Sequence, residues 1–365
     1  MATLAEPLTQ FAHLAHHAPT PAAVRAALLA DPGFGKVFSD HMVTIEWSEG
    51  QGWHNATLGP RGPIALDPAA AVLHYAQEIF EGMKAYRLAD GALALFRPEA
   101  NARRFNLSAD RLAMPHVPEE LFVQAVRELV AADADWFPEV DGGSLYLRPF
   151  MIATEAFLGV RPAKSYKFIV IASPAGNYFK SGAPAVSIWV SDYSRAAPGG
   201  TGAAKCGGNY AASLVPTAEA FAKGHDQVLF LDAAEHKWIE ELGGMNLFFV
   251  HADGLLVTPP LRGTILAGIT RESVIALARD EGLTVREEKY SLDQWRADAA
   301  SGELVEVFAC GTAAVVTSVG TVADRNGSFQ IGSGGPGQLT GKLRQRLVAI
   351  QRGEAPDPHG WVMRL

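Results

Sequence analysis

Short strand-like runs alternate with amphipathic helical runs along the whole chain, and this alternation restricts the chain to folds that combine helices with sheets. No internal repeat accompanies it. Nine strands are predicted at 42–47, 92–96, 145–148, 168–172, 186–190, 228–232, 247–250, 284–288 and 305–309. Predicted helices begin near Pro68 and Pro118 and cover 213–223, 271–279 and 339–351. The pattern therefore predicts an α+β fold.

The length of 365 residues corresponds to about two domains. Gly, Pro, Ser and Asn concentrate between Pro174 and Pro184, which is typical of an exposed connector. We therefore predict a small N-terminal domain over 1–175, a connector over 176–184 and a larger domain over 185–365. The first ~30 residues form an N-terminal extension, with a helix predicted to start at Pro21 behind Thr20 as N-cap.

Composition excludes several classes of protein. Apolar residues make up 48% of the chain, which is enough for a core, and the net charge of −8 with no basic run argues against nucleic-acid binding. No apolar stretch approaches the ~18 residues that span a bilayer, and the first 24 residues contain no Lys or Arg. Two cysteines, Cys206 and Cys310, form neither a disulfide framework nor a metal spacing. We expect a cytoplasmic protein without a metal site or a membrane partner.

A glycine-rich motif near the C-terminus is the first candidate for ligand binding. Gly332, Gly334 and Gly337 satisfy G-x-G-x-x-G, but only 28 residues follow, too few for a dinucleotide-binding unit. We interpret the motif as a turn and a helix start. Two other segments, 199–206 and 336–343, match a phosphate-binding loop only superficially, and no G-x-S-x-G elbow is present.

Lys205 is the stronger candidate for chemistry. It stands in TGAAKCGGNYAAS, where small residues on both sides leave its amine accessible to a ligand. A lone lysine is ordinarily a solvated surface residue, so its context decides. That context is given by LHYAQEIFEGMKAY, NARRF, SLYLRP, IEELGGMNLFFV, TPPLRGTILAGITRES and FACGTAA.

Together and in this order, these segments resemble the branched-chain amino acid aminotransferases of the fold-type IV family of pyridoxal 5′-phosphate enzymes. The resemblance covers about 34–361 and is nearest to the longer forms that carry FGKVFxDHM, here 34–42. It implies a two-domain fold like that of D-amino acid aminotransferase, with a small α/β N-terminal domain and a larger domain that holds the cofactor on a mixed sheet. It also implies a homodimer.

The resemblance assigns the central chemistry to two residues. Lys205 would form the Schiff base with pyridoxal 5′-phosphate and, once released, move the proton between the substrate Cα and the cofactor. Glu241 would hold the ring nitrogen protonated so that the ring stays an electron sink. Glu240 is the rival, although strand alternation would direct it to the opposite face.

Further residues of the family would hold the rest of the cofactor. Arg104, rather than Arg103, matches the phosphate-binding arginine. A helix start and hydroxyl groups would complete the phosphate site, and a tyrosine would bind the 3′ oxygen. These residues are Ile269, Thr270, Thr312 and Tyr210.

Substrate recognition would combine an anion site with an apolar pocket. The α-carboxylate would meet the backbone N–H groups of Thr312 and Ala313, helped by Tyr146 and Arg148, and Arg148 would also accept glutamate. Taken singly, Tyr75, Phe80 and Tyr146 fit core positions better than pocket walls. Arg148 would otherwise be a surface arginine or an interface ion-pair partner, and Thr312 a turn residue. The pocket walls implied by the family are Tyr75, Phe80, Tyr178 and Tyr210.

The implied reaction is transfer of the amino group of L-leucine, L-isoleucine or L-valine to 2-oxoglutarate. Alternatives are a D-amino acid aminotransferase, an aminodeoxychorismate lyase, or a non-catalytic protein that has kept the fold. Two departures from the animal enzymes stand out. Ala314 and Thr317 replace their CxxC pair, and Gly244 replaces a threonine near the cofactor ring.

Overall fold

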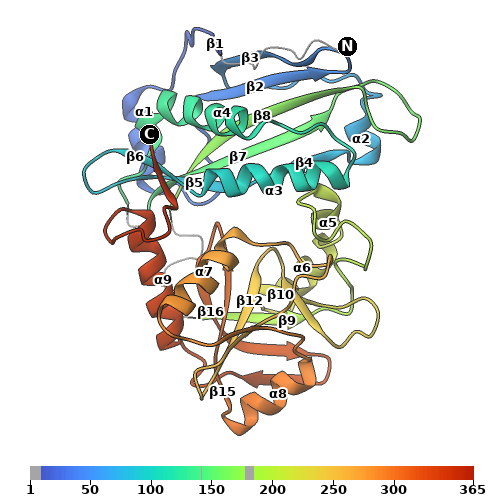
Figure 1. Ribbon diagram of the computed structural model, residues 1–365, viewed down its shortest axis with the longest axis vertical. Coiled ribbons are helices and arrows are strands. Elements are labelled where there is room, and N and C mark those ends of the chain that lie inside the picture. The colour runs from blue at the N-terminus through green and yellow to red at the C-terminus, as the bar shows by residue number, and fades with distance from the viewer. Residues whose placement is uncertain (1–9, 141, 177–184) are drawn as a thin grey trace. The chain divides into compact units, whose positions relative to one another are not determined.

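The computed structural model describes residues 10–140, 142–176 and 185–365, and the chain divides into two compact units (Figure 1). Each unit contains a nine-stranded sheet with helices, so the predicted α+β class is confirmed. Unit 1 comprises Met1–Tyr178, Ala204–Gly207 and Gln351–Leu365, and unit 2 comprises Phe179–Ala203 and Gly208–Ile350.

The sheet of unit 1 has the order β1-β3-β2-β8-β7-β5-β6-β18, with β4 paired to β7. All pairs are antiparallel except β1 with β3. The strands are β1 Ala12–His13, β2 His41–Ser48, β3 Gly52–Pro60, β4 Glu78–Phe80, β5 Met83–Arg87, β6 Leu93–Phe96, β7 Ser144–Ala153, β8 Ser165–Ala175 and β18 Val362–Arg364. The helices are α1 Ala22–Ala30, α2 Ala71–Tyr75, α3 Pro98–Arg111 and α4 Glu119–Ala132, followed by the 3₁₀ turn Ala134–Trp136.

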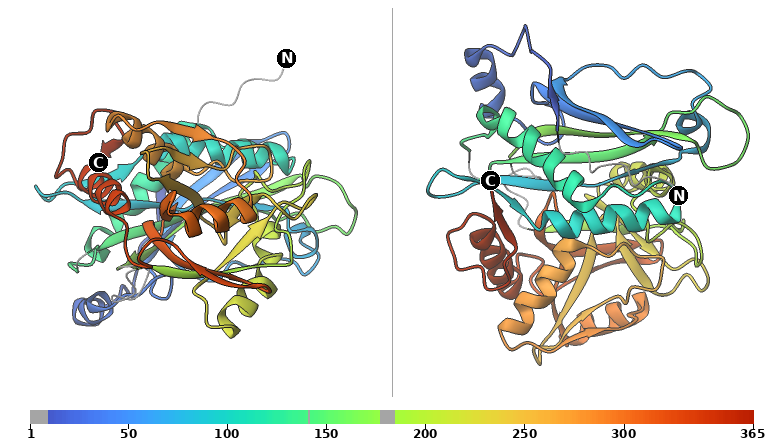
Figure 2. Two further views of the ribbon diagram at one scale, coloured as in Figure 1. Left: turned by 90° about the horizontal axis from the view of Figure 1, so that it is seen from below. Right: turned by 45° about the horizontal axis from the view of Figure 1, so that its top comes forward.

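Helices α3 and α4 lie side by side against this sheet (Figures 1 and 2). Apolar residues recur along α4 at helical spacing and are buried against β2 and β8. The rings of Phe105, Phe122 and Phe168 join both helices to the sheet, with centroids 5.4 to 5.6 Å apart. This core fixes α3, which carries Arg104 on its buried side.

The sheet of unit 2 has the order β11-β10-β9-β16-β15-β12-β13-β14, with β17 paired to β16, and mixes parallel with antiparallel pairs. The strands are β9 Val186–Val190, β10 Gln227–Leu231, β11 Ile239–Leu242, β12 Asn246–His251, β13 Leu256–Thr258, β14 Val285–Glu287, β15 Leu304–Gly311, β16 Val315–Asp324 and β17 Gly327–Gln330. The helices are α5 Gly207–Ala211, α6 Leu214–Ala222, α7 Ile269–Asp280, α8 Leu292–Ser301 and α9 Gln338–Gln351.

The core of unit 2 is centred on β12, where every residue is buried. The Phe249 ring contacts the rings of Tyr290 and Trp295, at centroid distances of 4.4 and 5.0 Å. Helices α7 and α8 both pack on β15, next to β12 in the sheet. The strands that precede the candidate site residues are therefore fixed by a continuous apolar core.

One local prediction, the N-cap of the first helix, differs from the structure. Thr20 does not cap α1, because its hydroxyl donates to Asp40 at 2.6 Å and Pro21 occupies the N-cap. The two compact units are not separated by a single connector, because β18 pairs with β6 and brings the C-terminal residues into unit 1. The predicted boundary at 176–184 stays a prediction, because 177–184 lie outside the described residues.

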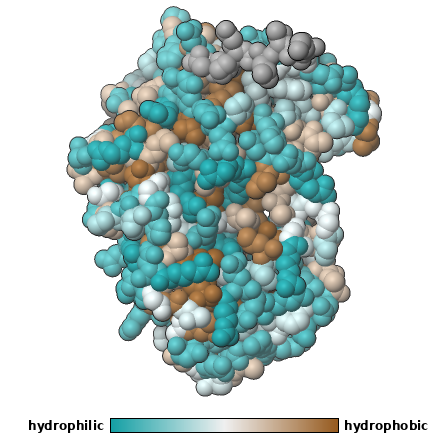
Figure 3. Space-filling model, viewed as in Figure 1, coloured by the Kyte–Doolittle hydropathy of each residue, from teal (hydrophilic) through white to brown (hydrophobic). Residues whose placement is uncertain are grey.

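The outer face shown in Figure 3 is mostly hydrophilic, with separate hydrophobic patches between the polar residues. Among the described residues, no helix combines the length and the apolar character that crossing a bilayer requires. Both cysteines are buried free thiols.

Candidate active site

Lys205 belongs to a cluster of predicted site residues in unit 1. Its Nζ lies 4.9 Å from the centroid of the Phe80 ring, and the guanidinium carbon of Arg148 lies 4.7 Å from the same centroid. Arg148 Nη2 also donates to the Tyr146 hydroxyl at 3.1 Å. The structure therefore brings one ammonium, one guanidinium and two aromatic rings together, a combination suited to an anionic ligand that carries an apolar part.

Strand geometry explains why these side chains meet. Tyr146 and Arg148 are two residues apart on β7, so they share one face of the sheet. Gly82, beside β4, makes room for this face, because a Cβ there would overlap the Tyr146 hydroxyl. Glycine is thus required at position 82 for Tyr146 to occupy its place.

The peptide of Lys205 is held on both sides. Its N–H donates to Ser108 Oγ at 2.9 Å, and its carbonyl accepts from the Phe80 N–H at 3.0 Å. Ser108 is buried on α3 and donates to the Arg104 carbonyl at 3.1 Å. Sequence reasoning missed Ser108, although its position one helical turn after Arg104 places both residues on the same side of α3.

Arg104 forms a buried ion pair that orients its guanidinium. Nε and Nη2 each lie 2.7 Å from an oxygen of Glu81, whose side chain is fully buried. Arg103 instead is exposed and lies 3.4 Å from Glu119. This difference in burial supports Arg104 over Arg103 as a ligand-binding residue, and it adds Glu81 as a partner that sequence reasoning missed.

Two further predicted pocket residues, Tyr75 and Tyr178, stay predictions. Tyr75 ends α2, is 39% exposed and donates its hydroxyl to the Leu158 carbonyl. Tyr178 lies outside the described residues.

A second group of predicted site residues lies in unit 2, centred on Glu241. Glu241 is buried on β11, with Oε2 3.3 Å from Arg195 Nη2 and Oε1 accepting from the Leu266 N–H. Arg195 Nη2 also donates to the Thr264 carbonyl at 2.6 Å. The Glu241 side chain is thus oriented by a buried guanidinium and a backbone N–H, as a partner for a ring nitrogen must be.

Glu240 has a different environment. Its Oε1 accepts from the Thr264 hydroxyl at 2.5 Å, and its Oε2 is buried without a hydrogen-bond partner among the described residues. Burial raises the pKa of Glu240, against smaller opposing effects of Thr264 and Arg195. The simple alternation expected for this strand is not kept, because the pairing of β11 with β10 shifts register at this point, so both glutamates reach residues 264–266.

The N-terminus of α7 carries two predicted phosphate ligands, Ile269 and Thr270, both buried. Gly268 at the N-cap forms no side-chain cap, and a Cβ there would overlap Asn246 Oδ1. A helix start of this kind attracts anions. The predicted hydroxyl of Thr312 and the Ala313 N–H lie in the turn that joins β15 to β16.

Tyr210 lies on α5 beside Gly244. A Cβ at Gly244 would lie 3.6 Å from Tyr210 Cε1, which is ordinary van der Waals contact. Tyr210 therefore does not require a glycine at position 244, where the sequence departs from the animal enzymes.

The glycine-rich motif at 332–337 is a turn before α9, as predicted from the sequence. The Glu306 carboxylate accepts from the N–H groups of Leu339 and Thr340, at 3.0 and 2.9 Å. The position at which a nucleotide phosphate would bind is thus filled by a carboxylate of the protein.

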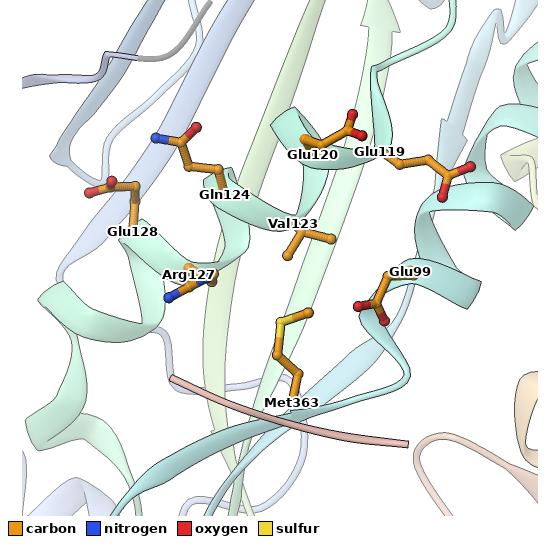
Figure 4. A pocket seen from close by; sticks show the side chains of 8 residues that line it. All are labelled: Glu99, Glu119, Glu120, Val123, Gln124, Arg127, Glu128 and Met363. Atoms are coloured by element: carbon orange, nitrogen blue, oxygen red, sulfur yellow. The ribbon is translucent and has the colours of Figure 1, made fainter. Parts of the chain in front are cut away.

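An acidic groove of about 590 Å³ lies along α4 and contains none of the predicted site residues (Figure 4). Glu119, Glu120, Gln124 and Glu128 follow α4, with Glu99 from α3 opposite. Within the described ranges, no three acidic, histidine or cysteine side chains gather in a way that would hold a metal ion.

Comparison with known proteins identifies the family. The family described as Amino-transferase class IV matches residues 78–322. A branched-chain-amino-acid aminotransferase of Mycolicibacterium smegmatis is 56% identical over 98% of both chains, and a probable one of Streptomyces coelicolor is 59% identical over 93% of this chain and 94% of its own.

Solved structures agree with these relatives. The branched-chain amino acid aminotransferase of Escherichia coli superposes with a TM-score of 0.73 at 30% identity, covering 87% of this chain and 98% of that one. The branched-chain amino acid aminotransferase from T.th., complexed with N-(5′-phosphopyridoxyl)-L-glutamate, gives 0.72 at 30% identity, with 87% and 97% covered. The chain therefore belongs to the class IV aminotransferases, within their branched-chain-amino-acid aminotransferase branch.

Proposed function

We propose that this protein transfers the amino group of L-leucine, L-isoleucine or L-valine reversibly to 2-oxoglutarate, with pyridoxal 5′-phosphate as cofactor. The observation that carries the proposal is the cluster of Lys205, Phe80 and Arg148, in which an amine and a guanidinium both lie within 5 Å of one aromatic ring. The relatives named above support both the reaction and the cofactor.

The donor set fits this cofactor. An aldehyde needs an amine, a phosphate needs fixed cationic or N–H donors, and a pyridine nitrogen needs a carboxylate. Lys205 supplies the amine, Arg104 and the start of α7 supply the phosphate donors, and Glu241 supplies the carboxylate. Thr312 and Tyr210 are proposed as hydroxyl ligands of the phosphate and the 3′ oxygen.

When bound, the cofactor supplies an electron sink that stabilises negative charge at the substrate Cα. The chain supplies the acid–base chemistry. Nζ of Lys205 binds the cofactor and, when substrate takes its place, carries the proton to and from Cα. Glu241, held by Arg195, keeps a proton at the ring nitrogen because an ionised carboxylate stabilises the adjacent cation.

Substrate binding is proposed for the same face of unit 1. The Nε of Arg148 is buried and has no hydrogen-bond partner among the described residues, so a substrate carboxylate would satisfy it. Phe80 and Tyr146 offer apolar contact to a branched side chain, with Tyr75 and Tyr178 as further proposed walls. Thr312 and Ala313 are proposed to bind the α-carboxylate.

A homodimer is part of the proposal. Leu73, Leu158 and Val160 are large apolar residues with 59%, 66% and 89% of their surfaces exposed, and the Tyr75–Leu158 hydrogen bond joins the segments that carry them. Apolar residues gathered in this way favour contact with a second subunit.

The buried, unpaired thiols of Cys206 and Cys310 support a reducing, cytoplasmic location.

The test is Lys205→Ala, with exposed Lys164→Ala as control. We expect Lys205→Ala to lose the visible absorbance of the bound cofactor and transamination with leucine, while the control keeps both. Retained turnover in Lys205→Ala would refute the assignment. Wild-type turnover of D-leucine but not L-leucine would favour a D-amino acid aminotransferase, and release of pyruvate from aminodeoxychorismate would favour the lyase.

A further inference from the structure

Glu78 is a carboxylate with no part in the site described above, yet it lies on the same strand face as Phe80. The two residues are the first and third of β4, and Ile79 between them is completely buried. Because side chains alternate along a strand, Glu78 and Phe80 share one face. That face carries the Phe80 ring against which Lys205 lies.

The Glu78 side chain contacts the backbone next to Lys205. Its Oε1 accepts from the N–H of Gly207, two residues after Lys205. The Lys205 peptide is already held by Ser108 and by the Phe80 N–H, so three groups anchor this short segment. Glu78 is the charged one, and hydrogen bonds to a charged acceptor are about twice as strong as neutral ones.

The contact also explains why residue 207 is glycine. A Cβ at Gly207 would overlap Glu78 Oε1 and approach its carboxyl carbon to 3.2 Å. The two positions are therefore sterically coupled, and the carboxylate reaches the backbone only because no side chain intervenes.

The surroundings of Glu78 do not favour a merely solvated carboxylate. Glu78 is half-buried, and burial raises its pKa, while the Gly207 N–H and the positive charge of Arg148 act in the opposite direction. A half-buried carboxyl group is stabilised only where specific donors compensate for lost hydration. Here that donor is the Gly207 N–H, in the segment that carries Lys205, and Arg148 adds its positive charge.

The geometry points to Glu78 as a positioning residue for Lys205: its carboxylate anchors the backbone on the C-terminal side of the lysine. This inference rests on the proposed function of Lys205. Without the Glu78 carboxylate, Ser108 and Phe80 still hold the peptide of Lys205, but the attachment at Gly207 is lost. A displacement of ~1 Å at a reacting group can cost about 10²-fold in rate.

The experiment compares Glu78→Gln, which keeps an oxygen acceptor, with Glu78→Leu, which removes it at similar volume. Glu49→Gln, at an exposed carboxylate paired with Lys164, is the matched control. Each purified protein is loaded with pyridoxal 5′-phosphate and reduced with borohydride, and mass spectrometry gives the fraction of Lys205 labelled. The cofactor dissociation constant, kcat and the KM for leucine are measured in parallel.

We expect Glu78→Leu to label Lys205 less completely and to lose about 10- to 10²-fold in kcat with little change in KM. Glu78→Gln keeps the oxygen acceptor but loses the charge, so it should lose clearly less than Glu78→Leu, and Glu49→Gln should stay near wild type. The inference is refuted if Glu78→Leu labels and turns over like wild type, or if Glu78→Gln loses as much as Glu78→Leu. A wild-type protein that is not labelled at Lys205 would instead refute the proposed function.

Gly207→Ala provides a second variant should Glu78→Leu fail to fold. Its added methyl group displaces the carboxylate from the other side, so the same loss in kcat is expected. The double variant Glu78→Ala/Gly207→Ala should be no slower than Glu78→Ala alone, because both changes remove one contact. Fully additive losses would contradict the anchoring role.

Discussion

Nη2 of Arg195 lies 3.3 Å from Oε2 of Glu241, and both side chains are buried in unit 2. The same nitrogen also donates to the Thr264 carbonyl, and the Leu266 N–H donates to the other oxygen of Glu241. The carboxylate is thus fixed in direction before any ligand binds, which lowers the reorganisation needed when charge develops nearby.

The two neighbouring glutamates should differ sharply in their effect on catalysis. Glu241→Gln removes the negative charge proposed to keep the ring nitrogen protonated, and we expect kcat to fall by about 10²-fold or more. Glu240→Gln keeps an acceptor for the Thr264 hydroxyl and should stay within about threefold. Steady-state kinetics with leucine and 2-oxoglutarate give kcat for both variants. A larger loss in Glu240→Gln than in Glu241→Gln would make Glu240 the ring-nitrogen partner.

Glu240 should also make stability depend on pH. Burial raises its pKa in the folded state, so the folded protein keeps a proton that the unfolded chain releases near its ordinary value of 4.5. Stability linked to this group is therefore lost as pH rises through the raised pKa. We expect Glu240→Gln to increase the Tm relative to wild type at about pH 8 and to leave it unchanged at about pH 4. An equal shift at both pH values would contradict this explanation.

The Arg104–Glu81 pair predicts separate effects on stability and cofactor binding. Glu81→Ala removes both charge-assisted contacts that Glu81 makes with a buried guanidinium and should lower the free energy of unfolding of the cofactor-free protein by about 3–5 kcal/mol. The exposed Arg103–Glu119 pair is the control, because Glu119→Ala should cost less than about 1 kcal/mol. Denaturant unfolding of both variants gives the comparison.

Arg104→Lys tests the cofactor side of the same pair. A lysine cannot reproduce the two-pronged contact with Glu81, so the orientation of the positive charge is lost. We expect the affinity for pyridoxal 5′-phosphate to fall about tenfold or more, with Arg103→Lys near wild type. Equal effects at both positions, measured by fluorescence titration, would count against Arg104 as the phosphate ligand.

The sequence predicted the regular elements better than the contacts between them. All nine predicted strands overlap observed ones, because their apolar runs are bounded by turn residues. Other strands were missed: short ones such as β4, where three residues carry too little periodicity, but also the long strands β3 and β16. The helix expected near Pro68 is only Ala71–Tyr75, because the residues before it form a turn.

The candidate site was predicted through Lys205, Arg104 and Glu241, whose motifs are contiguous in the sequence. Their partners were not predicted: Ser108, Glu81 and Arg195 reach them through folding across 97, 23 and 46 positions. Single-sequence patterns report neighbours within a helix or a strand and carry no signal for such distant pairs. The register shift beside Glu240 was missed for the same reason, since it depends on the pairing with β10.

Glu306 should stabilise α9 and exclude a nucleotide from its N-terminus. The carboxylate accepts two backbone N–H groups and the Thr340 hydroxyl, at 2.9 to 3.0 Å, and so takes the role of a helix cap from a distant strand. Glu306→Ala should lower the free energy of unfolding by about 1–2 kcal/mol, whereas exposed Glu303→Ala should have little effect. Addition of NAD should leave the Tm of the wild type unchanged, because this carboxylate occupies the anion position. A rise in Tm with NAD that disappears in Gly334→Val would show instead that the glycine-rich motif binds a dinucleotide.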